Sequence, residues 1–178
     1  TLSLAACGNS SSDSAETDSA ATEESTTTEA SDSEGSGEAV FKIGGIGPIT
    51  GGTAIYGTAV QNGIQIAVDE INAAGGINGY QINYDFQDDE GDSEKAINAY
   101  NTLKDWGMQV LVGTDTSAPC IAVAEETHND NMFQITPSGT AVECVQYENT
   151  LRMCFSDPTQ GTESAKYIGE NGMATKVA

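Results

Sequence analysis

The feature that most constrains the fold is an alternation of two kinds of segment, which begins at Val40. Short runs rich in Val, Ile, Tyr and Phe alternate with longer stretches in which apolar residues recur every three or four positions. The expected strands are residues 40–46, 80–86, 110–113, 132–135 and 151–155, and the expected helices are 57–74, 92–106, 119–130 and 159–171. Strands separated by helices pair in parallel, because each crossover returns the chain to the same end of the sheet. We therefore predict an α/β fold with a doubly wound, mainly parallel sheet.

A second region, residues 9–38, has a composition that cannot build a folded core. It holds nine acidic residues, no basic or aromatic residue, and no Ile, Leu or Val. Such a segment buries too little apolar surface to offset a backbone ordering cost of roughly 1–2 kcal/mol per residue. We predict a disordered acidic linker at residues 8–38, one folded lobe at 39–174, and the start of a truncated second lobe at 175–178. We expect the chain to be a fragment at both ends.

The N-terminal run Leu4-Ala5-Ala6-Cys7-Gly8 resembles the lipobox of bacterial lipoproteins. The resemblance implies that residues 1–7 end a lipoprotein signal peptide and that Cys7 receives the lipid. The protein would then be anchored at the extracytoplasmic face of the cell membrane, as in Gram-positive-type bacteria. The alternative is an ordinary apolar start with a free Cys7. No run in the sequence approaches the ~18 apolar residues of a membrane-spanning helix.

The net charge of the sequence excludes several partners. The formal net charge is −21, and outside residues 9–38 eighteen acidic residues stand against six Lys and Arg. Nucleic acids and anionic lipid surfaces both attract basic protein surfaces. We therefore expect neither nucleic acid binding nor electrostatic docking on anionic lipid.

Three cysteines remain once Cys7 is set aside, and an odd number allows at most one internal disulfide among them. We favour a bond between Cys144 and Cys154, which would close a short loop, and a bond between Cys120 and Cys154 is the alternative. No metal site is expected, because the sequence has no Cys-x-x-Cys motif. Its only histidine, His128, lies in a polar expected helix, where a solvated side chain is expected.

The turns after the expected strands lack the common motifs of catalysis and nucleotide binding. In Gly45-Ile46-Gly47-Pro48-Ile49-Thr50-Gly51, a threonine stands where the dinucleotide fingerprint needs its third glycine. The acidic run Asp88-Asp89-Glu90-Gly91-Asp92 lacks the spacing of a calcium loop, and we interpret it as a solvated turn that caps the next helix. The sequence also lacks the Gly-x-Ser-x-Gly of serine hydrolases. We expect neither an enzyme nor a cofactor.

Small hydroxyl residues gather in two of these turns, Thr114-Asp115-Thr116-Ser117-Ala118-Pro119 and Thr136-Pro137-Ser138-Gly139-Thr140. Open α/β sheets bind ligands outside the carboxyl ends of their strands, and free N–H groups at a helix start favour an anion. We predict that Ser117 and Thr140 bind a ligand carboxylate in a pocket shared with Tyr56. The alternative is that Ser117 and Thr140 only cap the helices that follow.

Five runs in the sequence carry a resemblance to a known family. In chain order they are Ile46-Gly47-Pro48-Ile49-Thr50-Gly51, Tyr56-Gly57, Ala67-Val68-Asp69-Glu70-Ile71-Asn72-Ala73-Ala74-Gly75-Gly76-Ile77-Asn78-Gly79, Ile135-Thr136-Pro137-Ser138-Gly139-Thr140 and Phe155-Ser156-Asp157-Pro158-Thr159-Gln160-Gly161. With these runs, residues 39–178 resemble the first lobe of a type I periplasmic binding protein of the branched-chain amino-acid (Leu/Ile/Val) class, which serves ATP-driven importers.

The resemblance implies roles for single residues. Ser117 and Thr140 would hold the carboxylate of an amino acid. The backbone carbonyl of Ser138 would help to hold its ammonium group, with Gly139 lining the same turn. Tyr56 would pack on the ligand side chain, and an anionic group from a second lobe would complete the ammonium site.

The resemblance also implies a function without chemistry. Ligand would bind one lobe in an open form, a second lobe would close over it, and a membrane permease would recognise the closed form. We therefore expect an extracytoplasmic substrate-binding lipoprotein of an ABC importer, monomeric, that captures an amino acid. The alternative is a ligand-sensing ectodomain of the same fold that binds a small amide, peptide or aromatic acid.

Overall fold

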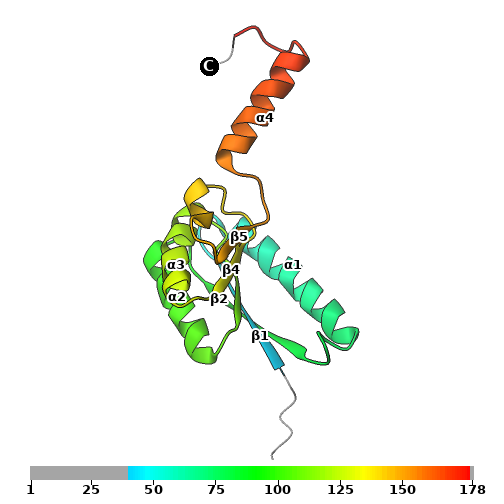
Figure 1. Ribbon diagram of the computed structural model, residues 1–178, viewed down its shortest axis with the longest axis vertical. Coiled ribbons are helices and arrows are strands. Elements are labelled where there is room, and N and C mark those ends of the chain that lie inside the picture. Colours follow the sequence, from blue (N-terminus) through cyan, green and yellow to red (C-terminus); the bar gives the residue numbers. More distant parts are fainter. Residues whose placement is uncertain (1–39, 177–178) are drawn as a thin grey trace, which may run out of the picture. The chain divides into compact units, whose positions relative to one another are not determined.

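The computed structural model describes residues 40–176, so the predicted linker and the predicted lipid attachment at Cys7 lie outside the described residues. Five strands form one parallel sheet in the order β2-β1-β3-β4-β5. The strands are β1 (Val40–Gly47), β2 (Gln81–Asp88), β3 (Val110–Gly113), β4 (Phe133–Thr136) and β5 (Thr150–Arg152). The helices are α1 (Ala54–Ala73), α2 (Ser93–Trp106), α3 (Ser117–Asn129) and α4 (Asp157–Glu170), with a 3₁₀ turn η1 (Val142–Val145). The predicted α/β class and parallel sheet are confirmed (Figure 1).

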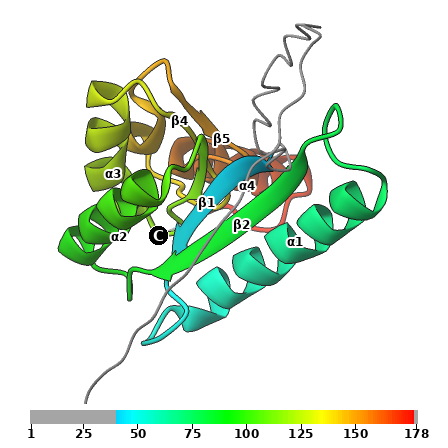
Figure 2. The same cartoon turned by 90° about the horizontal axis from the view of Figure 1, so that it is seen from below.

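The chain winds outward from β1 in both directions. After β1 it passes through α1 to β2 on one side, and then through α2 to β3 on the other side. Figure 2 shows α1 on one face of the sheet, and α2 and α3 on the opposite face. The winding direction reverses between β1 and β3, which is the place where open α/β sheets form their ligand crevice.

Two boundaries differ from the sequence prediction by three residues, and the others agree within two residues. Helix α1 begins at Ala54, three residues before the expected start, and it includes Gly57, where a Cβ atom would overlap the Pro48 carbonyl group. Strand β5 ends at Arg152, because after one further bond from the Met153 N–H to the Thr136 carbonyl (3.0 Å) the chain leaves the sheet edge. Residues 175 and 176, where the second lobe is predicted to start, form no strand, and residues 177 and 178 lie outside the described residues.

The hydrophobic core lies between the sheet and the pair α2 and α3. It is built from buried residues of β1, α2, β3 and α3 and of the turn before β3, namely Ile46, Ala96, Ala99, Tyr100, Leu103, Met108, Leu111 and Val123. Burying side chains of the size of Leu103 or Leu111 stabilises the fold by about 1.5–3 kcal/mol each. This core fixes the strand ends from which the loops of the pocket emerge.

Helix α2 shows how local sequence sets an element. The Asp92 side chain accepts a hydrogen bond from the Lys95 N–H at 2.9 Å, so Asp92, and not its neighbour Ser93, is the N-cap of the helix. The helix ends at Gly107, whose φ of 89° lies in the left-handed region that favours glycine. Between these caps its apolar residues point to the core.

The opposite face of the sheet is covered less completely. Helix α1 packs against β1 and β2. Along β3 and β4, Val112 and Ile135 are half-buried, while Phe133 is 42% and Leu151 of β5 is 50% exposed. Because burial alternates along these short strands, the four side chains belong to the face of the sheet away from α2 and α3.

Helix α4 differs from the other helices in burying no residue. It has a regular start, because the Ser156 side chain accepts a hydrogen bond from the Thr159 N–H at 3.3 Å and Pro158 lies in its first turn. Its position along the chain agrees with the expected helix at 159–171. The predicted lobe boundary at residue 174 stays a prediction.

Candidate functional site

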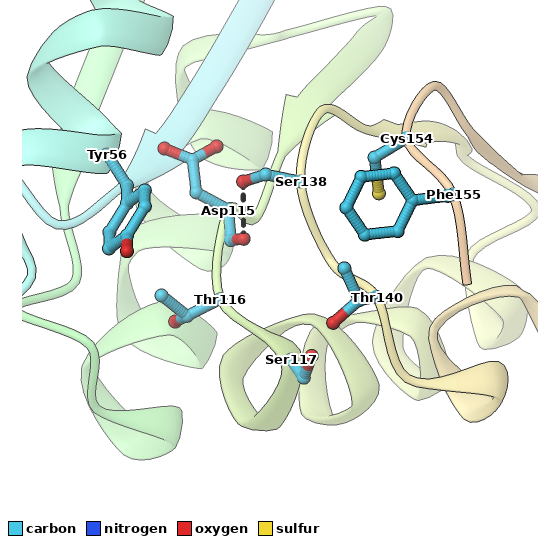
Figure 3. Close-up of a pocket in the computed structure, with 8 residues that line it drawn as sticks. All are labelled: Tyr56, Asp115, Thr116, Ser117, Ser138, Thr140, Cys154 and Phe155. Carbon is cyan, nitrogen blue, oxygen red and sulfur yellow. Dashed lines mark hydrogen bonds between the residues drawn. The ribbon is translucent and has the colours of Figure 1, made fainter. Parts of the chain in front are cut away.

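A cavity of about 460 Å³ opens at the carboxyl ends of the strands (Figure 3). Its volume is in the range of small-molecule sites. One lining residue comes from α1, three from the turn after β3, two from the turn after β4 and two from the segment after β5; they are Tyr56, Asp115, Thr116, Ser117, Ser138, Thr140, Cys154 and Phe155. The cavity therefore lies beside the reversal of winding between β1 and β3.

The Ser117 side chain joins the two hydroxyl turns. Ser117 is the first residue of α3, and its Oγ accepts a hydrogen bond from the Ala141 N–H at 3.3 Å. Beside it, Thr116 occupies the N-cap position without a side-chain capping bond, and its buried Oγ1 has no partner among the described residues. A hydroxyl in this state is free to bond a ligand oxygen.

Two short hydroxyl bonds join the turn after β4 to the turn after β3. Ser138 Oγ donates to the Asp115 carbonyl at 2.6 Å, and Thr136 Oγ1 donates to the Thr114 carbonyl, also at 2.6 Å. Thr136 Oγ1 in turn accepts a hydrogen bond from the Gly139 N–H at 2.9 Å. The two turns are thus fixed relative to each other by the protein itself.

The Arg152 side chain is hydrogen-bonded to the turn that contains Thr140. Its Nη1 donates to the Thr140 carbonyl at 3.2 Å and to the Ala141 carbonyl at 2.8 Å. The Thr140 carbonyl also accepts the Asp157 N–H at 3.0 Å, which links this turn to the start of α4. Nη1 of the guanidinium group therefore bonds two backbone carbonyls of this turn.

The structure brings four of the five predicted ligand-binding residues to one cavity: Tyr56, Ser117, Ser138 and Thr140. The fifth, Gly139, is buried behind the turn and is not among the lining residues. The capping alternative is wrong for Ser117, because its hydroxyl bonds the other turn instead of its own helix. Thr140 precedes the 3₁₀ turn η1 instead of an α-helix. Contacts of these residues with a ligand stay a prediction.

Asp115 is a lining residue that the sequence prediction did not single out. It is only 2% exposed, and neither carboxylate oxygen has a hydrogen-bond partner among the described residues. Burial, and to a smaller extent the negative charge of Asp89, raises the pKa of Asp115 to about 7. The sequence signal was its place directly behind a buried strand, inside a turn of hydroxyl residues.

The acidic run after β2 is only partly the solvated turn that we expected. Asp92 caps α2, and Asp88 Oδ1 accepts hydrogen bonds from the Ile49 N–H at 3.0 Å and the Glu90 N–H at 2.9 Å. Asp89, in contrast, is fully buried, with Oδ1 bonded to the Gly91 N–H and Oδ2 unpaired among the described residues. Burial raises the pKa of Asp89. The run therefore holds the loop after β1 and contributes negative charge next to the cavity.

All three cysteines of the described residues are free thiols, so the expected bond between Cys144 and Cys154 is not formed in the structure. Cys120 and Cys144 instead lie together at Gly139, where a Cβ atom would be 3.3 Å from Cys120 Sγ and 3.0 Å from Cys144 Sγ. Cys154 Sγ lies 3.6 Å from the Gly139 carbonyl. The pairing prediction failed because separation along the chain does not report which thiols the turn after β4 brings together.

Residues 40–176 contain no group of three or more His, Cys, Asp or Glu side chains placed to hold a metal ion. His128 is exposed and its ring stacks on Tyr147, with centroids 4.2 Å apart. In the same part of the chain, no helix is both long enough and apolar enough to cross a bilayer.

Comparison with known proteins points to one family. The family model described as "Periplasmic binding protein" matches residues 40–178. The chain is similar to the Leu/Ile/Val-binding protein BraC3 of Rhizobium johnstonii, with 37% identity over 79% of this chain and 39% of that protein. It is also similar to the branched-chain amino acid transporter substrate-binding protein LivJ of Streptococcus pneumoniae, solved with isoleucine, at 33% identity and a TM-score of 0.69 over 74% of this chain and 38% of that one.

A more distant structure shows the fold alone. The solute-binding protein of an ABC transporter from Rhodopseudomonas palustris, solved with 3,4-dihydroxybenzoic acid, has 21% identity and a TM-score of 0.68 over 75% of this chain and 37% of that chain. The chain spans about two fifths of the length of the relatives it matches.

Proposed function

Because this chain belongs to the periplasmic binding protein family, in its branched-chain amino-acid class, we propose that it captures an amino acid outside the cytoplasm and delivers it to the permease of an ABC importer. The relatives named above are binding proteins by name, which supports a role in ligand capture.

The observation that carries the proposal is the convergence of hydroxyl groups at the cavity. Thr116, Ser117, Ser138 and Thr140 come from two neighbouring turns and line the cavity, and no Lys, Arg or His belongs to the lining. A carboxylate can be held by hydroxyl donors and backbone N–H groups in such a setting. We assign the ligand carboxylate to Ser117 and Thr140, the ligand ammonium in part to the Ser138 carbonyl, and the ligand side chain to Tyr56.

The proposed mechanism is closure of two lobes over the ligand. The described lobe would bind ligand first, and a second lobe would then cover it and expel water from the cavity. The greater length of the relatives supports such a second lobe. The closed form would be the one that the permease recognises.

We further propose that Cys7 carries a lipid that holds the protein at the outer face of the cell membrane. The lipobox-like run Leu4-Ala5-Ala6-Cys7 supports this, followed as it is by the acidic segment 8–38. Expression with a native signal peptide and radiolabelled fatty acid tests it, since Cys7→Ser should abolish labelling and release the protein. Retention of the Ser variant at the membrane would contradict the anchor.

The ligand site is tested by calorimetry on the complete protein with amino acids. Ser117→Ala and Thr140→Ala should each weaken binding by about 5- to 100-fold, which corresponds to about 1–3 kcal/mol for a lost charge-assisted hydrogen bond. Thr102→Ala is the matched control, because this exposed hydroxyl on α2 bonds only its own helix, at the Asn98 carbonyl. If both pocket variants bind as tightly as this control, the ligand site lies elsewhere.

A further inference from the structure

The wall of the cavity contains one acidic side chain that no described residue partners. Among its lining residues Asp115 is the only carboxylate, and no lining residue carries a positive charge. Both of its oxygens are buried and unpaired among the described residues. An unpaired buried carboxylate is costly, so its presence in the wall of a binding cavity calls for an explanation.

The position of Asp115 separates it from the hydroxyl groups. Figure 3 shows its carboxylate on the Tyr56 side of the cavity, turned away from Ser117 and Thr140. The oxygens lie against Gly47 at the end of β1, where a Cβ atom would overlap Asp115 Oδ2. If a ligand places its own carboxylate at Ser117 and Thr140, its other end lies nearer the Tyr56 side, where the Asp115 carboxylate is buried in the wall.

No cation of the described residues compensates this charge. Asp89 and Tyr84 are the titratable groups that act on Asp115 or feel its charge, and neither is positive. Arg152, which contacts the turn after β4, donates its Nη1 to the Thr140 and Ala141 carbonyls. Lys95 and Lys104 form ion pairs with Glu90 and Asp130. The Tyr56 end of the cavity therefore carries an uncompensated negative charge in a wall of low polarity, where charge acts strongly.

We propose that Asp115 determines specificity by favouring an amino acid whose side chain ends in a cationic group over Leu, Ile or Val. This inference rests on the proposed function and names the ligand class of that same site. A side-chain ammonium or guanidinium group placed near Tyr56 would provide the counter-charge that the fold omits. An aliphatic side chain of equal length would bring no counter-charge to this buried carboxylate.

The raised pKa of Asp115 gives the inference a second readout. Near pH 7 part of the ligand-free protein holds a proton on this group, because burial raises its pKa to about 7. A cationic ligand lowers that pKa again, so binding should release a fraction of a proton. Binding of an aliphatic amino acid should release none from this group.

The test compares L-lysine with L-norleucine on the complete protein, since norleucine is lysine without the terminal ammonium group. Calorimetry at pH 7 should give lysine at least ten-fold tighter binding than norleucine and leucine, with a binding heat that depends on the ionisation enthalpy of the buffer. Asp115→Asn should weaken the binding of lysine at least ten-fold and leave the affinity for norleucine within about three-fold of the unsubstituted protein. It should also abolish the dependence of the binding heat on the buffer. Asp105→Asn, an exposed acid on α2, is the matched control.

The outcomes separate this inference from the proposed function. Tighter binding of leucine or norleucine than of lysine, or an equal effect of Asp115→Asn on both ligands, would overturn the role of Asp115 and keep the protein as an amino-acid binder. Absence of binding to every amino acid tried would overturn both. Circular dichroism of Asp115→Asn establishes that the variant is folded, and its norleucine affinity shows whether the rest of the site is intact.

Discussion

The two faces of the sheet differ in how their buried polar groups are hydrogen-bonded. Under α2 and α3, the buried Gln134 amide is fully paired: its Oε1 accepts from Thr127 Oγ1 and its Nε2 donates to the Gly113 carbonyl, both at 2.8 Å. Asn149 Oδ1, on the residue whose Nδ2 bonds Thr127, is the exception without a partner among the described residues. On the α1 face, the Tyr84 hydroxyl and both Asp115 oxygens have no partner among the described residues. Buried polar groups are normally satisfied, and the unpaired carboxylate of Asp115 therefore contrasts with the paired amide of Gln134, which supports the fold.

Apolar groups follow the same division. Leu111 of β3 points to α2 and α3 and is fully buried, whereas Leu151 of β5 is half exposed on the other face. Since the hydrophobic contribution scales with the area removed from water, the free energy of unfolding should depend mainly on the α2 and α3 face. Four substitutions probe this division, beginning with the one expected to have the largest effect.

Leu111→Ala should destabilise the chain by about 2–5 kcal/mol, because it opens a cavity in the closed core. Denaturant unfolding followed by circular dichroism measures the change. A loss below about 1 kcal/mol would show that the core under α2 and α3 relaxes around the vacancy, and that the proposed division between faces is wrong.

The pH dependence of stability should report the protonation of Asp115, which lies on the α1 face. Its pKa is about 7 in the fold and near its ordinary value of 3.8 when unfolded, so between these values the folded chain holds the extra proton. The free energy of unfolding should therefore fall as the pH rises from about 4 to about 7, by no more than about 1.4 kcal/mol per pH unit, and stay level above.

Asp115→Asn is the variant that assigns this slope. It should remove most of the fall between pH 4 and pH 7, as measured by denaturant midpoints in a pH series, and raise stability at pH 8 relative to the unsubstituted chain. An unchanged slope would mean that the carboxylate is ionised in the fold throughout this range.

Thr127→Val, on the covered face, should cost about 1–3 kcal/mol. The change keeps the shape of the side chain but removes the hydroxyl that bonds Gln134 Oε1, which then stays buried without this donor. Thr102→Val on the exposed side of α2 serves as the control and should change the denaturation midpoint little. Equal effects of the two would indicate that the Gln134 network is not matched as described.

Leu151→Ala should have the smallest effect, below about 1 kcal/mol, because the side chain is already half exposed. The same unfolding measurement applies. A cost as large as that of Leu111→Ala would show that something covers this face in solution.

The order and type of the elements could be predicted because their signals are local. Apolar periodicity gave the strands and helices, and Asp92 and Gly107 marked the ends of α2. Ser117 and Thr140 could be assigned to one site because carboxyl ends of parallel strands meet at one edge.

The remaining features depend on contacts between distant segments. The charge state of Asp115 depends on Gly47, Asp89 and Tyr84, which lie 26 or more positions away along the chain. The proximity of the Cys120 and Cys144 thiols depends on how the turn after β4 folds around Gly139. Neither leaves a periodic or spacing signal in the sequence.

The hydroxyl-to-carbonyl bonds from Ser138 and Thr136 have a consequence for the kinetics of capture. They order the turns after β3 and β4 while the chain folds, so the loss of loop entropy precedes the encounter with ligand. When the described lobe's part of the site is already ordered, ligand can bind without a preceding rearrangement of these turns. The rate of capture should then be governed by diffusion and by whatever closes over the cavity, and variation in affinity among ligands should appear chiefly in how long each one stays.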